Sequence, residues 1–176
     1  MAVAIQSPPK TLMEVYRMLP EGTRAEIIDG ILYMSPAPLV NHQGLIMKLS
    51  SQLFFHCEEN KLGEVFTSPI DVYLNNKNAF QPDIIFISKD NNSIVKEDGI
   101  YGAPDVIVEV LSPGTSRSDL TKKKPAYEKA GVKEYWVVDP KTKLAIGFRQ
   151  MKGKFEEFKR EKGKLSSSLL KHVFKF

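Results

Sequence analysis

The sequence is poor in cysteine and contains no long apolar run. Cys57 is the only cysteine among 176 residues, which excludes an internal disulfide and a cysteine-rich zinc site. No segment approaches the roughly 20 consecutive apolar residues of a membrane-spanning helix. The first residues, MAVAIQSPPK, lack the apolar stretch of a secretory signal. We therefore expect a protein of the reducing cytoplasm that has no membrane partner.

The chain is long enough for one domain with its own core. With 176 residues, of which 42% are hydrophobic, it can bury a core of ordinary size. We expect a single domain over residues 1–176, with a loose N-terminal arm over 1–10 and peripheral strands over 143–176. The formal net charge of +4 favours a polyanionic partner. Ordinary solubility explains a charge of this size equally well, so the charge does not select a partner by itself.

Hydrophobic periodicity and turn signals predict a mixture of helices and strands. Thr11 and Glu14 form a capping box, and Asp29-Gly30 is typical of a tight hairpin turn. The expected elements, in chain order, are a helix over 12–19, the hairpin, a helix to about residue 58, strands within 64–74, 82–88 and 104–112, a helix over 119–130, a strand within 132–140, and a hairpin over 143–150 and 153–159. The polar segment 89–103 reads as an exposed loop. This order predicts an α/β fold with a mixed β-sheet flanked by α-helices.

An acidic residue lies inside the most apolar of these strands. Glu109 stands in VIVEVLSP, where β-branched residues on both sides indicate that both sheet faces are covered. A buried carboxylate is costly unless a cation pairs with it. Asp83 opens another strand, so the two carboxylates could meet if the strands pair. Two hard oxygen ligands, with a backbone carbonyl and waters, suit Mg²⁺ or Mn²⁺.

Other roles remain open for these residues. An Asp that follows proline, as Asp83 does, is commonly a turn or capping residue, and Asp105 follows Pro104 in the same way. A buried Lys or Arg could satisfy Glu109 without any metal. His42, at the start of an amphipathic helix, could serve only in capping or packing.

Several pieces of the sequence together resemble the Uma family of restriction-type endonucleases. These pieces are AEIIDGILYMSP, His42, QPDIIFIS, VIVEVLSP, Asp119, Lys123, Tyr127 and AGVKEYWVVDP. They extend over roughly residues 14–150, and their combination is specific although each piece is weak. The resemblance implies the PD-(D/E)XK nuclease fold, a restriction-endonuclease-like mixed β-sheet flanked by α-helices with peripheral β-hairpins. It also implies metal-dependent hydrolysis of phosphodiester bonds.

The resemblance assigns roles to individual residues. Asp83 matches the first acid of the nuclease motif and Glu109 the second, and together they would bind Mg²⁺ or Mn²⁺. Leu111 stands where the general motif has lysine. The chain is similar here to nucleases whose lysine comes from the following helix, which makes Lys123 the catalytic candidate. Glu26 matches an early acid of the family and is a further catalytic or supporting candidate.

The basic residues around this motif are candidate nucleic-acid contacts. Successive helical residues point about 100° apart, so at most one lysine of the run 122–124 can face the site. Tyr127 lies four residues after Lys123 and favours that lysine. Pro125 is unexpected so close to it, because a proline past the first turn bends a helix. The remaining candidate contacts are His42, Lys122, Lys124 and Arg117.

The resulting functional prediction is an endonuclease that uses Mg²⁺ or Mn²⁺ to hydrolyse nucleic acid, with DNA as the expected substrate. A homodimer is expected, because cleavage of two strands commonly uses two symmetric sites. Two alternatives stay open. One is a catalytically inactive nuclease-fold module that binds nucleic acid or protein, and the other is a hydrolase of a different phosphate ester.

Overall fold

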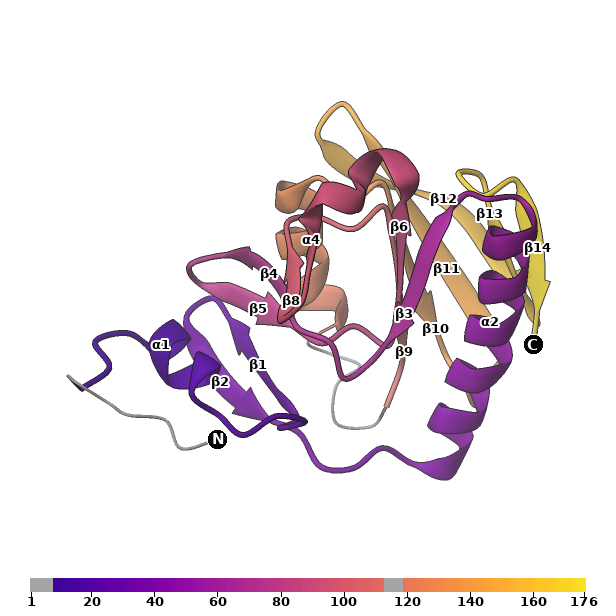
Figure 1. The fold of residues 1–176 in the computed structure, drawn as a ribbon. Coiled ribbons are helices and arrows are strands. Elements are labelled where there is room, and N and C mark those ends of the chain that lie inside the picture. Colours follow the sequence, from indigo (N-terminus) through magenta and orange to yellow (C-terminus); the bar gives the residue numbers. More distant parts are fainter. Residues whose placement is uncertain (1–7, 113–118) are drawn as a thin grey trace.

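The protein is built around a six-stranded mixed β-sheet (Figure 1). The computed structural model describes residues 8–112 and 119–176. The strand order is β12-β11-β10-β9-β6-β3, in which only the β9–β10 pair is parallel. The bounds are β3 (Gly63–Thr67), β6 (Ile84–Ser88), β9 (Val106–Val110), β10 (Glu134–Val138), β11 (Leu144–Met151) and β12 (Lys154–Lys162). The predicted mixed sheet is therefore present.

A second sheet packs beside the first and carries the N-terminal hairpin. Its order is β2-β1-β5-β4-β8-β7. The bounds are β1 (Ala25–Ile28), β2 (Ile31–Met34), β4 (Val72–Asn75), β5 (Asn78–Phe80), β7 (Val95–Lys96) and β8 (Gly99–Tyr101). Asp29 and Gly30 both have positive φ in the turn of the first hairpin, as their sequence predicts. A separate hairpin, β13 (Lys164–Ser167) with β14 (His172–Lys175), ends the chain.

Helices cover the two faces of the main sheet. The short helix α1 (Leu12–Arg17) is capped by the hydroxyl of Thr11, and the long helix α2 (Val40–Glu59) lies along one side of the molecule beside β14 (Figure 1). The remaining helical segments are the 3-10 helix η1 (Lys89–Ile94), the π-helical turn η2 (Asp119–Lys123) and the helix α4 (Lys124–Ala130), which ends at Gly131. No helix among the described residues is both long and apolar enough to cross a membrane.

The alternation of side chains along β9 decides what Glu109 faces. Val106, Val108 and Val110 pack in a core cluster with α2, while Ile107 packs in another cluster with Tyr127 of α4. Because successive side chains of a strand point to opposite faces, Glu109 shares the face of Ile107. The acid therefore points toward α4 and the second sheet.

Two parts of the sequence interpretation are corrected by the structure. The segment 89–103 is not an exposed loop, because it contains η1, β7 and β8, and Ile100 is fully buried. The helix expected over 119–130 has α-helical geometry only from Lys124 onward and starts as the π-helical turn η2. The short strand β5 was not expected at all. It pairs with β1 on one side and with β4 on the other, and these pairings cannot be predicted from the sequence of β5 itself.

Candidate active site

Glu109 and Asp83 lie on directly opposed positions of neighbouring strands. Strands β6 and β9 are antiparallel, with Ile84 opposite Val108. The next pair in this register is Asp83 opposite Glu109, and directly opposed residues of an antiparallel pair share one face. Both acids are buried. The β6–β9 register therefore brings the backbones of Asp83 and Glu109 to neighbouring positions, and whether their carboxylates share one metal ion stays a prediction.

The buried carboxylate of Glu109 is paired with a buried lysine. The Nζ atom of Lys123 lies 3.2 Å from Oε1 of Glu109 and 2.8 Å from Oε1 of Glu26. Lys123 is itself only 3% exposed, so the ammonium group is enclosed between the two glutamates. The Tyr127 hydroxyl donates a second hydrogen bond, of 2.8 Å, to the same Glu109 oxygen. Burial, reinforced by the charge of Glu109, raises the pKa of Tyr127 well above its ordinary value, which keeps the hydroxyl a donor.

The local structure of η2 and α4 separates Lys123 from its neighbours. Lys122 is exposed and donates to the Tyr33 hydroxyl at 2.9 Å, while the Nζ atom of Lys124 lies 3.9 Å from the centroid of the Phe148 ring. Only the middle lysine of the run therefore faces Glu109. Pro125 falls in the first turn of α4, a position that proline commonly occupies. The proline that was unexpected in the sequence therefore lies at the junction between the π-helical turn η2 and the α-helix α4.

Asp83 is held by the backbone of the neighbouring strand and by His42. Its Oδ2 atom accepts a 2.7 Å hydrogen bond from the Val110 N–H and lies 3.3 Å from Nε2 of His42. His42 comes from the first turn of α2 and is only 5% exposed. Burial alone would lower the pKa of His42, but the hydrogen bond with Asp83, the charge of Asp83 and the Val110 backbone together outweigh burial and raise that pKa. His42 thus lies against one of the two motif acids, deep in the site.

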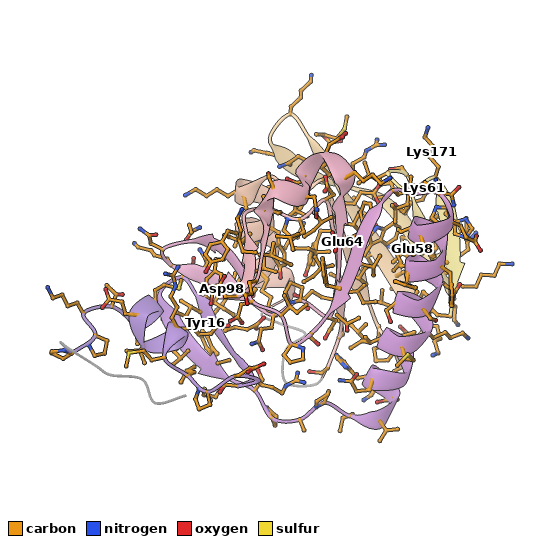
Figure 2. All side chains as sticks on the ribbon, in the orientation of Figure 1. Tyr16, Glu58, Lys61, Glu64, Asp98 and Lys171 are labelled. Atoms are coloured by element: carbon orange, nitrogen blue, oxygen red, sulfur yellow. The ribbon has the colours of Figure 1, made fainter. Side chains whose placement is uncertain are left out.

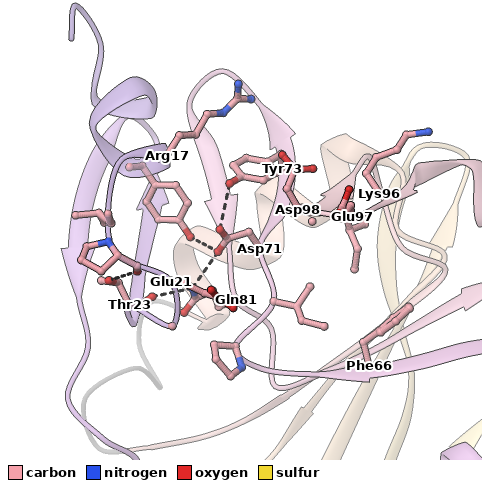
Figure 3. Close-up of a pocket in the computed structure, with 18 of the residues that line it drawn as sticks. Arg17, Glu21, Thr23, Phe66, Asp71, Tyr73, Gln81, Lys96, Glu97 and Asp98 are labelled. Carbon is pink, nitrogen blue, oxygen red and sulfur yellow. Dashed lines mark hydrogen bonds between the residues drawn. The ribbon is translucent and has the colours of Figure 1, made fainter. Parts of the chain in front are cut away.

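Glu26 is fixed by a residue that sequence reasoning gave no role. The Gln81 N–H donates to Oε1 of Glu26 at 2.9 Å, and the Gln81 side chain donates to Asp71 at 2.9 Å and to the Thr23 carbonyl. Figure 3 shows this Asp71 carboxylate in the wall of a cavity of about 730 Å³ that is separate from the candidate site. Asp71 also accepts hydrogen bonds from two tyrosine hydroxyls there. Gln81 therefore connects that cavity wall to the candidate site. The only sequence signal was its place in QPDIIFIS.

Five of the candidate residues line one pocket of about 380 Å³. Three carboxylates face it, together with two cationic side chains and His42: Glu26, Asp83, Glu109, Arg24, Lys123 and His42. The carboxylates outnumber the cations, and their oxygens are the hard donors that Mg²⁺ and Mn²⁺ prefer. Within residues 8–112 and 119–176, no three His, Cys, Asp or Glu side chains form a group ready to hold a metal ion.

Three described residues that the sequence analysis considered, Asp105, Lys122 and Lys124, do not line this pocket. Asp105 is fully buried but binds Lys133, the Ser88 N–H and the Asn91 amide at the other end of β9. Burial would raise its pKa, but these hydrogen bonds outweigh burial and lower it, which is typical of a structural carboxylate. Arg117 lies outside the described residues.

Comparison with known proteins gives a family match and a match to a solved structure. A model of the Uma2 family, described as "Putative restriction endonuclease", matches residues 12–172. No curated protein matches the sequence. One solved structure, of "a putative nuclease belonging to DUF820" from Anabaena variabilis ATCC 29413, has a TM-score of 0.74 and 20% sequence identity, over 92% of this chain and 91% of that chain. At this identity the likeness shows a shared fold, which confirms the fold class predicted from the sequence.

Proposed function

The chain belongs to the Uma2 family, and from this premise we propose that it is a metal-dependent endonuclease that hydrolyses phosphodiester bonds of DNA. The observation that supports the proposal most directly is the buried ammonium of Lys123 between two carboxylates, beside a third acid on the opposed strand. Three acids, Lys123, Arg24 and His42 line a single open pocket, where a phosphate and a water molecule could also be held.

The donor set of the pocket fits a hard divalent cation. Asp83 and Glu109 would hold Mg²⁺ or Mn²⁺, and Glu26 is a third carboxylate on the same pocket. The ammonium of Lys123 already marks a position at which two carboxylate oxygens converge on positive charge. A bound ion of this kind supplies an acidified water and neutralises charge on the attacked phosphate.

The chain's own residues supply positioning and charge. The Val110 N–H and His42 fix the Asp83 carboxylate, and the Tyr127 hydroxyl fixes Glu109. Lys123 would stabilise the negative charge that develops on the phosphate, or take part in removing the proton of the attacking water. Because its ammonium is enclosed by protein rather than by water, its electrostatic effect is stronger than that of a surface lysine.

A cleavage assay tests this function. Plasmid and single-stranded DNA are incubated with the protein in Mg²⁺, Mn²⁺ or EDTA. We expect nicking or linearisation only with a divalent ion, loss of cleavage in Glu109→Gln, and unchanged cleavage in Glu64→Gln, a control on the exposed side of β3 (Figure 2). Equal cleavage in EDTA, or full activity of Glu109→Gln, would rule out the proposed mechanism.

A binding module without catalysis is the second candidate function, favoured by Leu111 at the position of the motif lysine. DNA that is bound but never cut under any metal condition would support it. We also propose that the protein acts as a homodimer, because two symmetric sites would cut the two strands of a duplex. Light scattering at micromolar concentration distinguishes a dimer from a monomer.

A further inference from the structure

The candidate active-site pocket continues into a second pocket at the C-terminal ends of β9 and β10. This second pocket has a volume of about 200 Å³ and shares three residues with the first, Leu39, His42 and Ser112. Beyond them it is lined by Asn41, Leu111 and the turn Asp139–Lys141. The two pockets therefore form one groove that runs from the β1–β2 hairpin, past the acids, to the turn after β10.

The N-terminus of α2 opens into this groove. The helix has 20 residues, its N-cap residue Leu39 makes no side-chain capping hydrogen bond, and its first turn contains no acidic residue. A helix N-terminus carries partial positive charge and unsatisfied N–H groups, which together attract anions. Leu39 and Asn41, on either side of the first helical residue, both line the second pocket. The Asn41 Oδ1 atom accepts from the His42 N–H at 2.9 Å, so the other end of its amide is a donor group.

The turn after β10 brings a lysine to the opposite wall. Asp139 accepts hydrogen bonds from the backbone N–H groups of Lys141 and Thr142 and from the Thr142 hydroxyl. These bonds outweigh the effect of burial and lower the pKa of Asp139, so its charge is engaged within the turn. Lys141 is exposed and lines the pocket. The turn thus presents an exposed positive charge to this pocket, in which Asp139 is the one carboxylate among the described lining residues and is already hydrogen-bonded within the turn.

A buried polar atom in the shared wall points independently to a ligand. His42 lines both pockets and is 5% exposed. Its Nε2 atom lies against Asp83, but its Nδ1 atom has no hydrogen-bond partner among the described residues. A buried polar atom without a partner is costly, and such atoms are found where a ligand or an ordered water completes the bonding. The wall between the two pockets is therefore incomplete in the protein alone.

We propose that the second pocket binds a phosphate group of the nucleic-acid strand next to the phosphate that is cleaved. The N-terminus of α2, the Asn41 amide and the Lys141 ammonium would bind it, and the shared wall at His42 and Ser112 separates it from the acids. This inference rests on the proposed nuclease function. The proposed subsite also gives the direction in which the nucleic-acid strand leaves the active site: from the acids, across the end of β9, toward the end of β10.

Oligonucleotides in which one phosphate is replaced by a neutral analogue test which phosphate the second pocket binds. A set of DNA oligonucleotides, each with one uncharged methylphosphonate, is titrated by fluorescence anisotropy in EDTA at several salt concentrations. Lys141→Gln should weaken binding about tenfold at low salt and lower the salt slope by about one. The control is Lys61→Gln, an exposed lysine directly after the C-terminal end of α2, at the far end of that helix (Figure 2). It should leave both quantities unchanged.

The decisive result is whether the methylphosphonate and the Lys141→Gln substitution have independent or coupled effects on binding affinity. One methylphosphonate position should weaken binding to the parent protein but not to Lys141→Gln, because the contact is already missing there. Independent effects at every position, or equal behaviour of Lys141→Gln and Lys61→Gln, would overturn the proposed subsite even if the DNA is cleaved. Inorganic phosphate at millimolar concentration should compete weakly with the parent only. If no oligonucleotide is bound or cut at all, the nuclease function itself fails, and the subsite fails with it.

Discussion

Replacement of Lys123 by methionine removes the one charge that the structure encloses between two acids. Methionine has nearly the same length and no charge, so packing changes little. The two glutamate oxygens that contact Nζ, at 2.8 and 3.2 Å, are no more than about 6 Å apart. Two unit charges at that distance repel each other by about 3 kcal/mol when the effective dielectric constant is about 20. With the lost hydrogen bonds, we expect the free energy of unfolding without metal to fall by about 3–5 kcal/mol.

A divalent ion should reverse most of this loss. With the ammonium gone, the carboxylates of Glu26, Asp83 and Glu109 leave the pocket more negative, so Mn²⁺ should bind the variant at least as tightly as it binds the parent. At a free concentration of 100 times the dissociation constant, binding stabilises a protein by about 2.7 kcal/mol. Urea denaturation with and without Mn²⁺ measures both quantities. Cleavage of plasmid DNA should nevertheless be lost, because the charge that acts on the phosphate is missing.

Lys122→Met is the matched control, since Lys122 is the neighbouring lysine and is exposed. It should unfold within about 0.5 kcal/mol of the parent and keep cleaving DNA at saturating DNA concentration, where weaker binding through this candidate contact has no effect. Two results would refute the reasoning. If Lys123→Met is as stable as the parent without metal, the glutamates do not depend on the ammonium. If it cleaves DNA at the parental rate, Lys123 takes no part in the chemistry.

Three further changes test parts of the structure around the site, each by urea denaturation. Asp105→Ala should cost about 3 kcal/mol at pH 7. Because the folded pKa of Asp105 lies below its ordinary value of 3.8, this contribution is complete above about pH 4 and is lost as the pH falls through the folded pKa, so parent and variant should converge in acid. Tyr127→Phe removes the 2.8 Å hydrogen bond to Glu109 and should cost about 2 kcal/mol, whereas no change would mean that Glu109 is satisfied without it. Gly147→Ala would place a Cβ 2.6 Å from the Trp136 ring and should cost about 1–3 kcal/mol with altered tryptophan fluorescence; an unchanged spectrum would contradict the close packing.

The strands that carry the acids could be predicted, but the partners of the acids could not. VIVEVLSP indicates a covered strand because its apolar residues alternate around one carboxylate. Whether Asp83 lies opposite Glu109 depends on the β6–β9 register, in which the paired residues are 20 to 24 positions apart in the chain. The spacing from Tyr127 favoured Lys123 as the lysine that faces the site, but the turn η2 that carries it was not predicted, because no sequence periodicity indicates a single π-helical turn.

The segment 89–103 and the role of Gln81 were missed for a different reason. Strands β7 and β8 have two and three residues, and β8 is held by β4, which lies far from it in the sequence. Such short strands give too few residues for an alternating pattern. Gln81 binds Glu26 through its backbone N–H, which every residue except proline possesses. A role that rests on the backbone leaves no mark on residue type.

The departure from the general nuclease motif follows from what Leu111 does in this fold. Positions 107, 109 and 111 share one face of the strand, and Leu111 packs against the apolar cluster that contains Ile107 and Tyr127. A lysine there would place its stem in the contact that supports Tyr127, whose hydroxyl holds Glu109. Lys123 instead comes from η2, four residues before Tyr127. The cation and the hydroxyl that bind Glu109 thus belong to one continuous helical segment, so a shift of that segment would move both partners of Glu109 together.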